Sequence, residues 1–267
     1  MMLKKYIKAF VASVILLAGA CALFSFMQKT KPTLYLVGDS TVKNGKGKGD
    51  GGLWGWGNYL GNHFDTTKIT VENDALGGTS SRTFQTQGWW DKVAAKIKPG
   101  DYVIMQFGHN DSSPLVDSSR ARGTIKSNSD ESQELYNPLT KKTEVIHSYG
   151  WYLRKMISEA KAKGATVAVC SLIPRNSWKD GKVNRSTNDY GKWAAEAAKQ
   201  AGATFIDLNT LTADVYDTEG EAKVKSTYFN DKDHTHTIEA GAILNAKLVA
   251  EGIKQSKGFA LNKYLAK

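Results

Sequence analysis

A serine, a histidine and an aspartate stand where they could form a hydrolytic site. Ser40 directly follows an apolar run, and Asp233 and His236 lie three positions apart near the far end of the chain. A serine hydroxyl is a weak nucleophile that needs an adjacent base, and a histidine held by a carboxylate supplies one. These three side chains therefore predict a nucleophile, its base and the carboxylate that orients the base.

Attack of a serine on an acyl carbon creates an oxyanion, which must meet hydrogen-bond donors that are already in place. The backbone N–H groups of Ser40 and Gly78 and the side-chain amide of Asn110 could supply them. Gly78 suits this role because a residue without a side chain lets the substrate approach the backbone. The residue types thus favour acyl transfer.

Five short apolar runs are expected to form the strands that position these residues, since each is rich in β-branched or aromatic residues. They are residues 33–37, 69–73, 102–107, 166–172 and 204–208. Helical patterns, with apolar residues three and four apart, separate or follow the runs at residues 54–64, 89–97, 144–163, 187–200 and 238–254. This alternation predicts an α/β fold with a five-stranded parallel sheet covered on both faces.

The candidate residues follow the carboxyl ends of the predicted strands, where open α/β sheets bind ligands. Three polar blocks (38–41, 77–80 and 108–111) follow the first three strands, and a fourth (233–236) precedes the last helix. Two irregular segments, 44–52 and 111–143, leave the same edge. Segments as long as the second are usually functional or disordered. We therefore expect the four blocks to converge on one site.

The four blocks resemble motifs of the SGNH (GDSL-like) hydrolases, and the resemblance extends over about residues 33–253. The chain is most similar to the rhamnogalacturonan acetylesterase branch, through Gly-Asp-Ser-Thr at 38–41, Asn-Asp-Ala-x-x-Gly-x-Ser-x-Arg at 73–82, Gly-His-Asn-Asp at 108–111 and Asp-His-Thr-His at 233–236. The resemblance implies a flavodoxin-like three-layer α/β/α sandwich with no metal and no other cofactor. It also implies a triad of Ser40, Asp233 and His236 and an oxyanion hole of Ser40, Gly78 and Asn110.

The resemblance implies a carboxylic ester hydrolase that removes acetyl groups from the pectin backbone polysaccharide, with xylan, another glycan or a lipid ester as alternative substrates. Segment 111–143 has its own sequence, Arg-Ala-Arg-Gly-Thr-Ile included, so substrate details do not transfer from the family. Arg175 and Trp178, which follow the fourth strand, are candidates for contact with a sugar ring.

Two rival functions remain open. A metal-dependent hydrolase could use the cluster of Asp231, Asp233, His234 and His236, although no second cluster of ligands follows another strand. A carbohydrate-binding protein without activity would be expected to have a broken triad, whereas this triad is intact.

The net charge of +10 does not indicate nucleic-acid binding. Five lysines and no acidic residue fall within residues 1–31, so half of that charge belongs to the N-terminal segment. The other lysines are scattered, and no nucleic-acid-binding module is recognisable. Nucleic acid is therefore not an expected partner.

Residues 1–31 are expected to direct export, because a basic start precedes 19 uncharged residues at 9–27. A cleaved signal, an uncleaved membrane anchor and a lipoprotein attached at Cys21 all remain open. In each case the rest of the chain is exported and is periplasmic, attached to the cell envelope or secreted. Residues 32–257 are predicted to form the catalytic domain, which we expect to be monomeric, and 258–267 a C-terminal tail.

Overall fold

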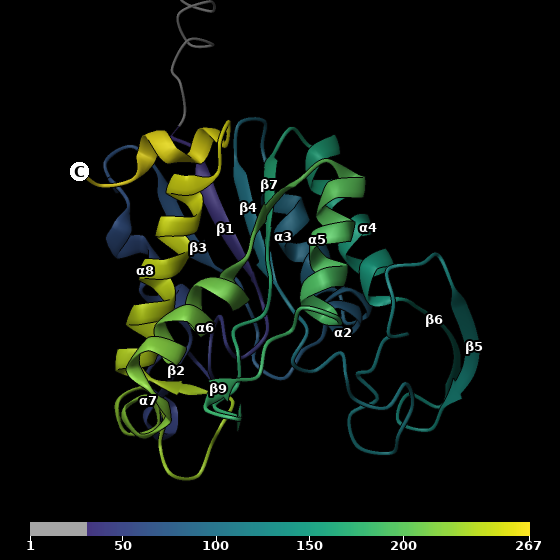
Figure 1. Ribbon diagram of the computed structural model, residues 1–267. Helices are drawn as coiled ribbons and strands as arrows, with labels where there is room; N and C mark the ends of the chain where they lie inside the picture. The colour runs from purple at the N-terminus through teal and green to yellow at the C-terminus, as the bar shows by residue number, and fades with distance from the viewer. Residues whose placement is uncertain (1–30) are drawn as a thin grey trace, which may run out of the picture. The chain divides into compact units, whose positions relative to one another are not determined.

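A parallel sheet of five strands forms the centre of the computed structural model, which describes residues 31–267 (Figure 1). The strands are β1 (Thr33–Gly38), β3 (Thr70–Asn73), β4 (Tyr102–Gln106), β7 (Thr166–Cys170) and β10 (Thr204–Ile206). Their order across the sheet is β10-β7-β4-β1-β3. The predictions of an export segment and of a lipoprotein site at Cys21 fall outside the described residues.

Side chains of each central strand enter two separate cores because successive residues of a strand point to opposite faces. In β1, Leu34 and Leu36 lie in one hydrophobic cluster, and Tyr35 and Val37 lie in the other. The inner strands β1, β4 and β7 are buried on both faces, and such strands have nearly continuous apolar sequences, which explains why their runs are recognisable. The predicted three-layer α/β fold with a five-stranded parallel sheet is confirmed.

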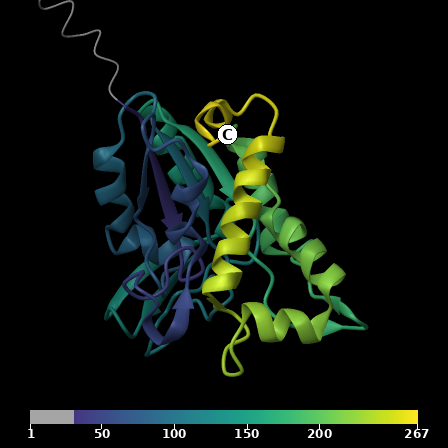
Figure 2. The same ribbon diagram turned by 90° about the vertical axis from the view of Figure 1, so that its left-hand side faces the viewer.

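Helices cover both faces of the sheet. The longer elements are α2 (Ser81–Thr86), α3 (Trp89–Lys96), α4 (Tyr149–Ala162), α5 (Tyr190–Ala201), α6 (Leu208–Glu219), α7 (Glu221–Tyr228) and α8 (Glu239–Gln255). The clusters place α6 and α8 on one face and α3, α4 and α5 on the other. Figure 2 views the molecule from the side of α8.

The α-helix predicted at 54–64 is wrong. The structure has the short strand β2 (Leu53–Trp54) there, followed by two 3₁₀ turns at Trp56–Asn58 and Leu60–His63. Glycines lower helix propensity, and Gly55 fits because a Cβ there would lie 2.3 Å from the Val42 carbonyl oxygen. The segment is thus built to contact the loop after β1.

Part of the irregular segment 111–143 folds as an antiparallel hairpin of β5 (Ser132–Asn137) and β6 (Lys142–His147). The hairpin lies at the edge of the molecule in Figure 1. Strand β6 occupies the first residues of the helix predicted at 144–163, and α4 instead begins after Ser148, whose side chain accepts a hydrogen bond from the Trp151 N–H. This hairpin was not predicted from the sequence.

The last ten residues, predicted as a tail, pack on the domain. Phe259 and Leu261 are buried in the same cluster as α8, and a 3₁₀ turn spans Ala260–Tyr264. The remaining short strands are β8 (Trp178–Lys179), β9 (Lys182–Val183) and β11 (Thr237–Ile238). No helix within residues 31–267 combines the length and the apolar character needed to cross a membrane.

Candidate active site

Ser40 lies in a tight turn directly after β1. A Cβ at Gly38 would lie 2.5 Å from the Gln106 carbonyl oxygen and from a Val42 methyl group, so only glycine fits where β1 ends beside β4. The carbonyl of Asp39 accepts hydrogen bonds from the N–H groups of Val42 and Lys43, at 3.1 Å each. This turn holds the serine at the carboxyl edge of the sheet, as predicted for a nucleophile.

The structure brings the three predicted catalytic residues into one hydrogen-bonded row. The Ser40 Oγ lies 2.7 Å from the His236 Nε2, and the His236 Nδ1 lies 2.7 Å from the Asp233 Oδ2. The other oxygen of Asp233 accepts the backbone N–H groups of Thr235 at 2.7 Å and His236 at 2.9 Å. In this arrangement the histidine can take the serine proton while the carboxylate orients it.

The Asp233 carboxyl is held in its ionised form. Its partial burial alone would raise its pKa, but the hydrogen bonds from His236 and Thr235 and the charge of His236 outweigh this effect and lower the pKa. An ionised carboxylate beside Nδ1 keeps the N–H on that nitrogen, and the lone pair of Nε2 then faces the serine.

Short strands bring Ser40 and His236 together, although 196 positions of sequence separate the two residues. Thr237, next to His236, pairs with Trp54 in the β2–β11 ladder. The segment after β2 bonds in turn to the nucleophile loop, since the Trp56 N–H donates to the Thr41 carbonyl at 3.0 Å. The non-helical form of residues 54–64 is therefore part of the device that places the base against the serine.

The predicted oxyanion donors line the same pocket as the serine. This pocket of about 320 Å³ contains Ser40, Gly78, Asn110 and His236 in its wall. Within residues 31–267, the backbone N–H groups of Ser40 and Gly78 have no protein acceptor. The Asn110 amide donates to the Thr79 carbonyl at 2.8 Å, which leaves its second N–H available. Gly78 has φ +83°, a conformation that favours glycine.

Replacing Asn110 by alanine is expected to lower kcat for ester hydrolysis by about 10²–10³-fold, because a charge that develops only in the transition state loses one donor. KM should change little. Steady-state kinetics on a soluble acetyl ester measures both constants. The variant also removes the contact with the Thr79 carbonyl, so its melting temperature is recorded alongside. A defect confined to KM would contradict the assignment.

A buried polar network stabilises the turn that carries Ser40. The Trp56 indole donates to the Gln106 side chain at 2.8 Å, and the Gln106 amide donates to the Thr41 hydroxyl. That hydroxyl donates to Asp39 at 2.7 Å, and the other Asp39 oxygen faces the His109 ring at 3.3 Å. Asp39 and His109 are both buried. They hold the turn rather than contact the pocket.

Asp111 fixes the loop that carries Asn110. Its carboxyl accepts the Ser81 hydroxyl at 2.5 Å and the N–H groups of Ser81 and Gly108 at 3.1 Å. Complete burial raises the pKa of Asp111 to about 7, with a further rise from the charge of Asp39, although the hydrogen bonds from Ser81 and Gly108 oppose it. The folded protein therefore binds a proton here that the unfolded chain releases near pH 4.

This raised pKa gives a pH-dependent contribution to stability. The contribution of Asp111 to the free energy of unfolding is complete below about pH 4 and is lost as the pH rises towards 7. The free energy of unfolding of the wild type minus that of Asp111→Asn is thus expected to be larger at pH 5 than at pH 8, by about 3 kcal/mol. Urea unfolding at the two pH values measures it, with the exposed Asp231→Asn as control. An equal difference at both pH values would contradict the assignment.

Arg82, the arginine of the 73–82 motif, holds the irregular segment in place. Its side chain is 2% exposed and lies 2.5 Å from Glu144 on the hairpin. It also donates to the carbonyls of Leu115 at 2.6 Å and Gly123 at 3.1 Å. One buried guanidinium therefore ties the hairpin and the loop at 115–123 to α2.

Arg82→Met is expected to lower the free energy of unfolding by about 3–5 kcal/mol, because a buried ion pair loses one partner. The surface pair Lys155–Glu159 provides the control, since Lys155→Met should cost less than about 1 kcal/mol. Chemical denaturation of the three proteins measures both values. Equal effects of the two substitutions would show that Arg82 does not hold the segment.

The two predicted sugar contacts lie outside the wall of the pocket that holds Ser40. Arg175 donates to the Thr235 hydroxyl and, at 3.2 Å, to the His109 carbonyl, so it joins the loop of the base to the loop of Asn110. Trp178 donates to the Asn176 side chain at 2.7 Å and packs against a small cluster that includes Tyr216. Their contact with substrate stays a prediction.

Arg120 and Arg122, which also line this pocket, were not among the predicted site residues. They belong to the Arg-Ala-Arg stretch of segment 111–143, which leaves the carboxyl edge of the sheet after β4. The position of this segment at the carboxyl edge was the only feature of the sequence that pointed to the two arginines.

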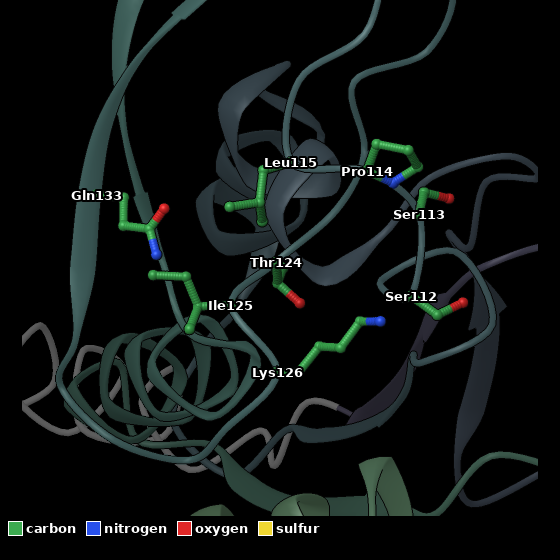
Figure 3. A pocket seen from close by; sticks show the side chains of 8 residues that line it. All are labelled: Ser112, Ser113, Pro114, Leu115, Thr124, Ile125, Lys126 and Gln133. Carbon is green, nitrogen blue, oxygen red and sulfur yellow. The ribbon is translucent and has the colours of Figure 1, made fainter.

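A second hollow of about 440 Å³ is lined by residues of segments 112–115 and 124–126 and by Gln133 of β5 (Figure 3). Leu115, Ile125 and Gln133 line one side of it in the picture, and Ser112 and Ser113 line the other.

No three Asp, Glu, His or Cys side chains within residues 31–267 are grouped so that they could hold a metal ion.

The chain is similar to known proteins over most of its length. The model of the GDSL-like lipase/acylhydrolase family matches residues 36–242. A rhamnogalacturonan acetylesterase of Emericella nidulans is 31% identical over 236 residues, which cover 88% of this chain and 89% of that protein. A probable rhamnogalacturonan acetylesterase of Bacillus subtilis, YesY, is 33% identical over 227 residues, which cover 83% and 92%.

Solved structures show the same fold. The crystal structure of YxiM from Bacillus subtilis matches with a TM-score of 0.68 and 28% identity, over 86% of this chain and 58% of that one, so this chain spans little more than half of it. The acetylxylan esterase Axe2 of Geobacillus stearothermophilus matches with a TM-score of 0.56 and 18% identity, over 85% and 94% of the two chains. The second likeness concerns the fold alone.

Proposed function

The chain belongs to the GDSL-like lipase/acylhydrolase family, and we propose that it is a serine esterase that removes acetyl groups from rhamnogalacturonan. The observation that carries the chemistry is the row of hydrogen bonds from Ser40 through His236 to Asp233, beside donors without a protein acceptor. The substrate is supported by the relatives named rhamnogalacturonan acetylesterase, which match over most of their length.

The reaction proceeds through an acyl-enzyme. The Ser40 oxygen attacks the acetyl carbonyl carbon while the His236 Nε2 takes the serine proton. The carbonyl oxygen becomes an oxyanion, which accepts hydrogen bonds from Ser40, Gly78 and Asn110. When the tetrahedral intermediate collapses, the bond to the sugar oxygen breaks and His236 returns its proton to that oxygen. Water, deprotonated by the same histidine, then releases acetate and restores the serine.

Acetate release from a panel of substrates tests the proposal. The panel holds acetylated rhamnogalacturonan, acetylated xylan and p-nitrophenyl esters of increasing chain length, each with and without EDTA. We expect release from rhamnogalacturonan to be fastest and insensitive to EDTA. Faster release from xylan, or cleavage of long-chain esters only, would leave the serine mechanism in place but contradict the assignment of rhamnogalacturonan as the substrate. Activity lost to the chelator would support the rival metal hydrolase.

We also propose that residues 1–31 direct export, since a basic start precedes a long uncharged stretch. The enzyme then meets its polymeric substrate outside the cytoplasm, either free or attached through this segment. N-terminal sequencing of the mature protein from a bacterial host distinguishes a cleaved chain from an intact one. A blocked terminus at Cys21 that carries lipid would identify the lipoprotein form.

A further inference from the structure

Two arginines form a wall of the active-site pocket. Arg120 and Arg122 line the pocket that holds Ser40, and both also line a neighbouring pocket of about 360 Å³ together with Gly78. Leu139, at the turn of the hairpin, lines the second pocket as well. The two guanidinium groups therefore lie where a chain leaving the reacting ester would continue.

The backbone between the arginines has an unusual conformation. Ala121 has φ +44° and is buried, although this region costs an ordinary residue about 1 kcal/mol or more. Asp117 stabilises the turn, since its side chain accepts the N–H groups of Ser119 at 2.6 Å and Arg120 at 2.5 Å. Backbone held in this way is concentrated at ligand sites, and here it directs both arginines to the pocket wall.

Neither arginine has an anionic partner within the described part of the chain. Arg82, Arg154 and Arg185 each pair with a carboxylate, whereas no ion pair involves Arg120 or Arg122. Arg122 spends one donor on the Gly78 carbonyl at 3.0 Å, and its Nε is buried without an acceptor. Burial and then the charge of Arg120 lower the pKa of Arg122, and the carboxylates of Asp117, Asp39 and Asp111, which are not in ion-pair contact with it, oppose this only in part. Two neighbouring cations without a carboxylate in contact are well placed to receive one from a ligand.

We propose that Arg120 and Arg122 bind the carboxylate of a uronic acid residue beside the acetylated position, and so select acidic over neutral glycans. A planar guanidinium matches a carboxylate with two parallel hydrogen bonds. Xylose units and acyl chains offer no such group, so this site would favour a galacturonan among the acetylated substrates. The identity of the polymer rests on the proposed function, whereas the carboxylate site rests on the two arginines.

The test compares acetylated rhamnogalacturonan oligosaccharides whose uronate carboxylates are free with the same oligosaccharides after methyl esterification. Acetate release gives kcat/KM for each form. Wild type is expected to prefer the free acid by about 10–100-fold, the usual effect of charge-assisted hydrogen bonds. Arg120→Gln should reduce this preference about tenfold. Arg122→Lys keeps the charge but loses the planar fork, so it should reduce the preference less.

Lys257→Gln provides the matched control, because it removes one exposed positive charge beyond the end of α8. Its preference should equal that of wild type. In wild type the preference should also decrease as salt is added, since ions screen exposed charges. A preference unchanged in Arg120→Gln, or reduced equally in Lys257→Gln, would overturn the proposal.

A second arm separates this proposal from the proposed function. If neither oligosaccharide is a substrate while p-nitrophenyl acetate is cleaved in a Ser40-dependent way, the assignment to pectin fails alone. Galacturonate is then tested as an inhibitor of that cleavage, with galactose as the neutral comparison. Stronger inhibition by galacturonate that is lost in Arg120→Gln supports the carboxylate site. Equal inhibition by the two sugars overturns it.

Discussion

Ser40→Ala is expected to lower kcat for acetate release by about 10⁶-fold, the size of the loss when the serine of a catalytic triad is removed. The variant removes the oxygen that forms the acyl-enzyme, and His236 alone has no group to deprotonate at that position. The remaining donors still bind the ester, so KM should change little. Steady-state acetate release, with long incubations and high enzyme concentration for the variant, measures the loss.

Ser226→Ala is a matched control for the loss of a hydroxyl group. Ser226 lies on the surface helix α7, and its hydroxyl donates only to the Lys223 carbonyl at 3.1 Å. The control should keep the wild-type rate, and both variants should keep the wild-type melting temperature within a few degrees. A Ser40→Ala enzyme that retains a tenth of the wild-type rate would exclude an acyl-enzyme at this residue.

Much of the candidate site could be predicted because its residues follow local rules. Asp233 and His236 lie within one turn of chain, so their hydrogen bond at 2.7 Å depends on local geometry. Ser40, Gly78 and Asn110 follow strands of one parallel sheet, and parallel strands deliver their carboxyl ends to one edge. Buried strands also have distinctive apolar sequences. The order of the strands in the sheet then brings together residues that are far apart in the chain.

Other parts depend on tertiary contacts that composition does not reveal. Residues 54–64 have helical spacing, but Gly55 packs against the Val42 carbonyl and the segment bonds to the nucleophile loop instead. The direction of Arg120 and Arg122 follows from the left-handed Ala121 and from a loop tied down by a buried ion pair. Neither feature has a local sequence signature, so the arginines could not be assigned to the pocket beforehand.

Asp233→Asn is expected to lower kcat by about 10⁴-fold while the fold stays intact. The asparagine oxygen can still accept the N–H groups of Thr235 and His236, which bond to one Asp233 oxygen in the structure. Its NH₂ group then replaces the oxygen that lies 2.7 Å from the His236 Nδ1. A donor at that position forces the proton of the ring onto Nε2, which then faces the serine as a donor and cannot take its proton.

The neighbouring Asp231→Asn separates this effect from a general loss of charge, because Asp231 is exposed and belongs to the cluster that a rival metal site would use. Under the triad mechanism, Asp231→Asn keeps nearly full activity, and EDTA changes neither enzyme. Under the metal mechanism, both substitutions weaken activity and added divalent metal partly restores it. Comparable losses in the two variants would therefore reject the triad, whereas a loss confined to Asp233→Asn follows only if that carboxylate acts through His236.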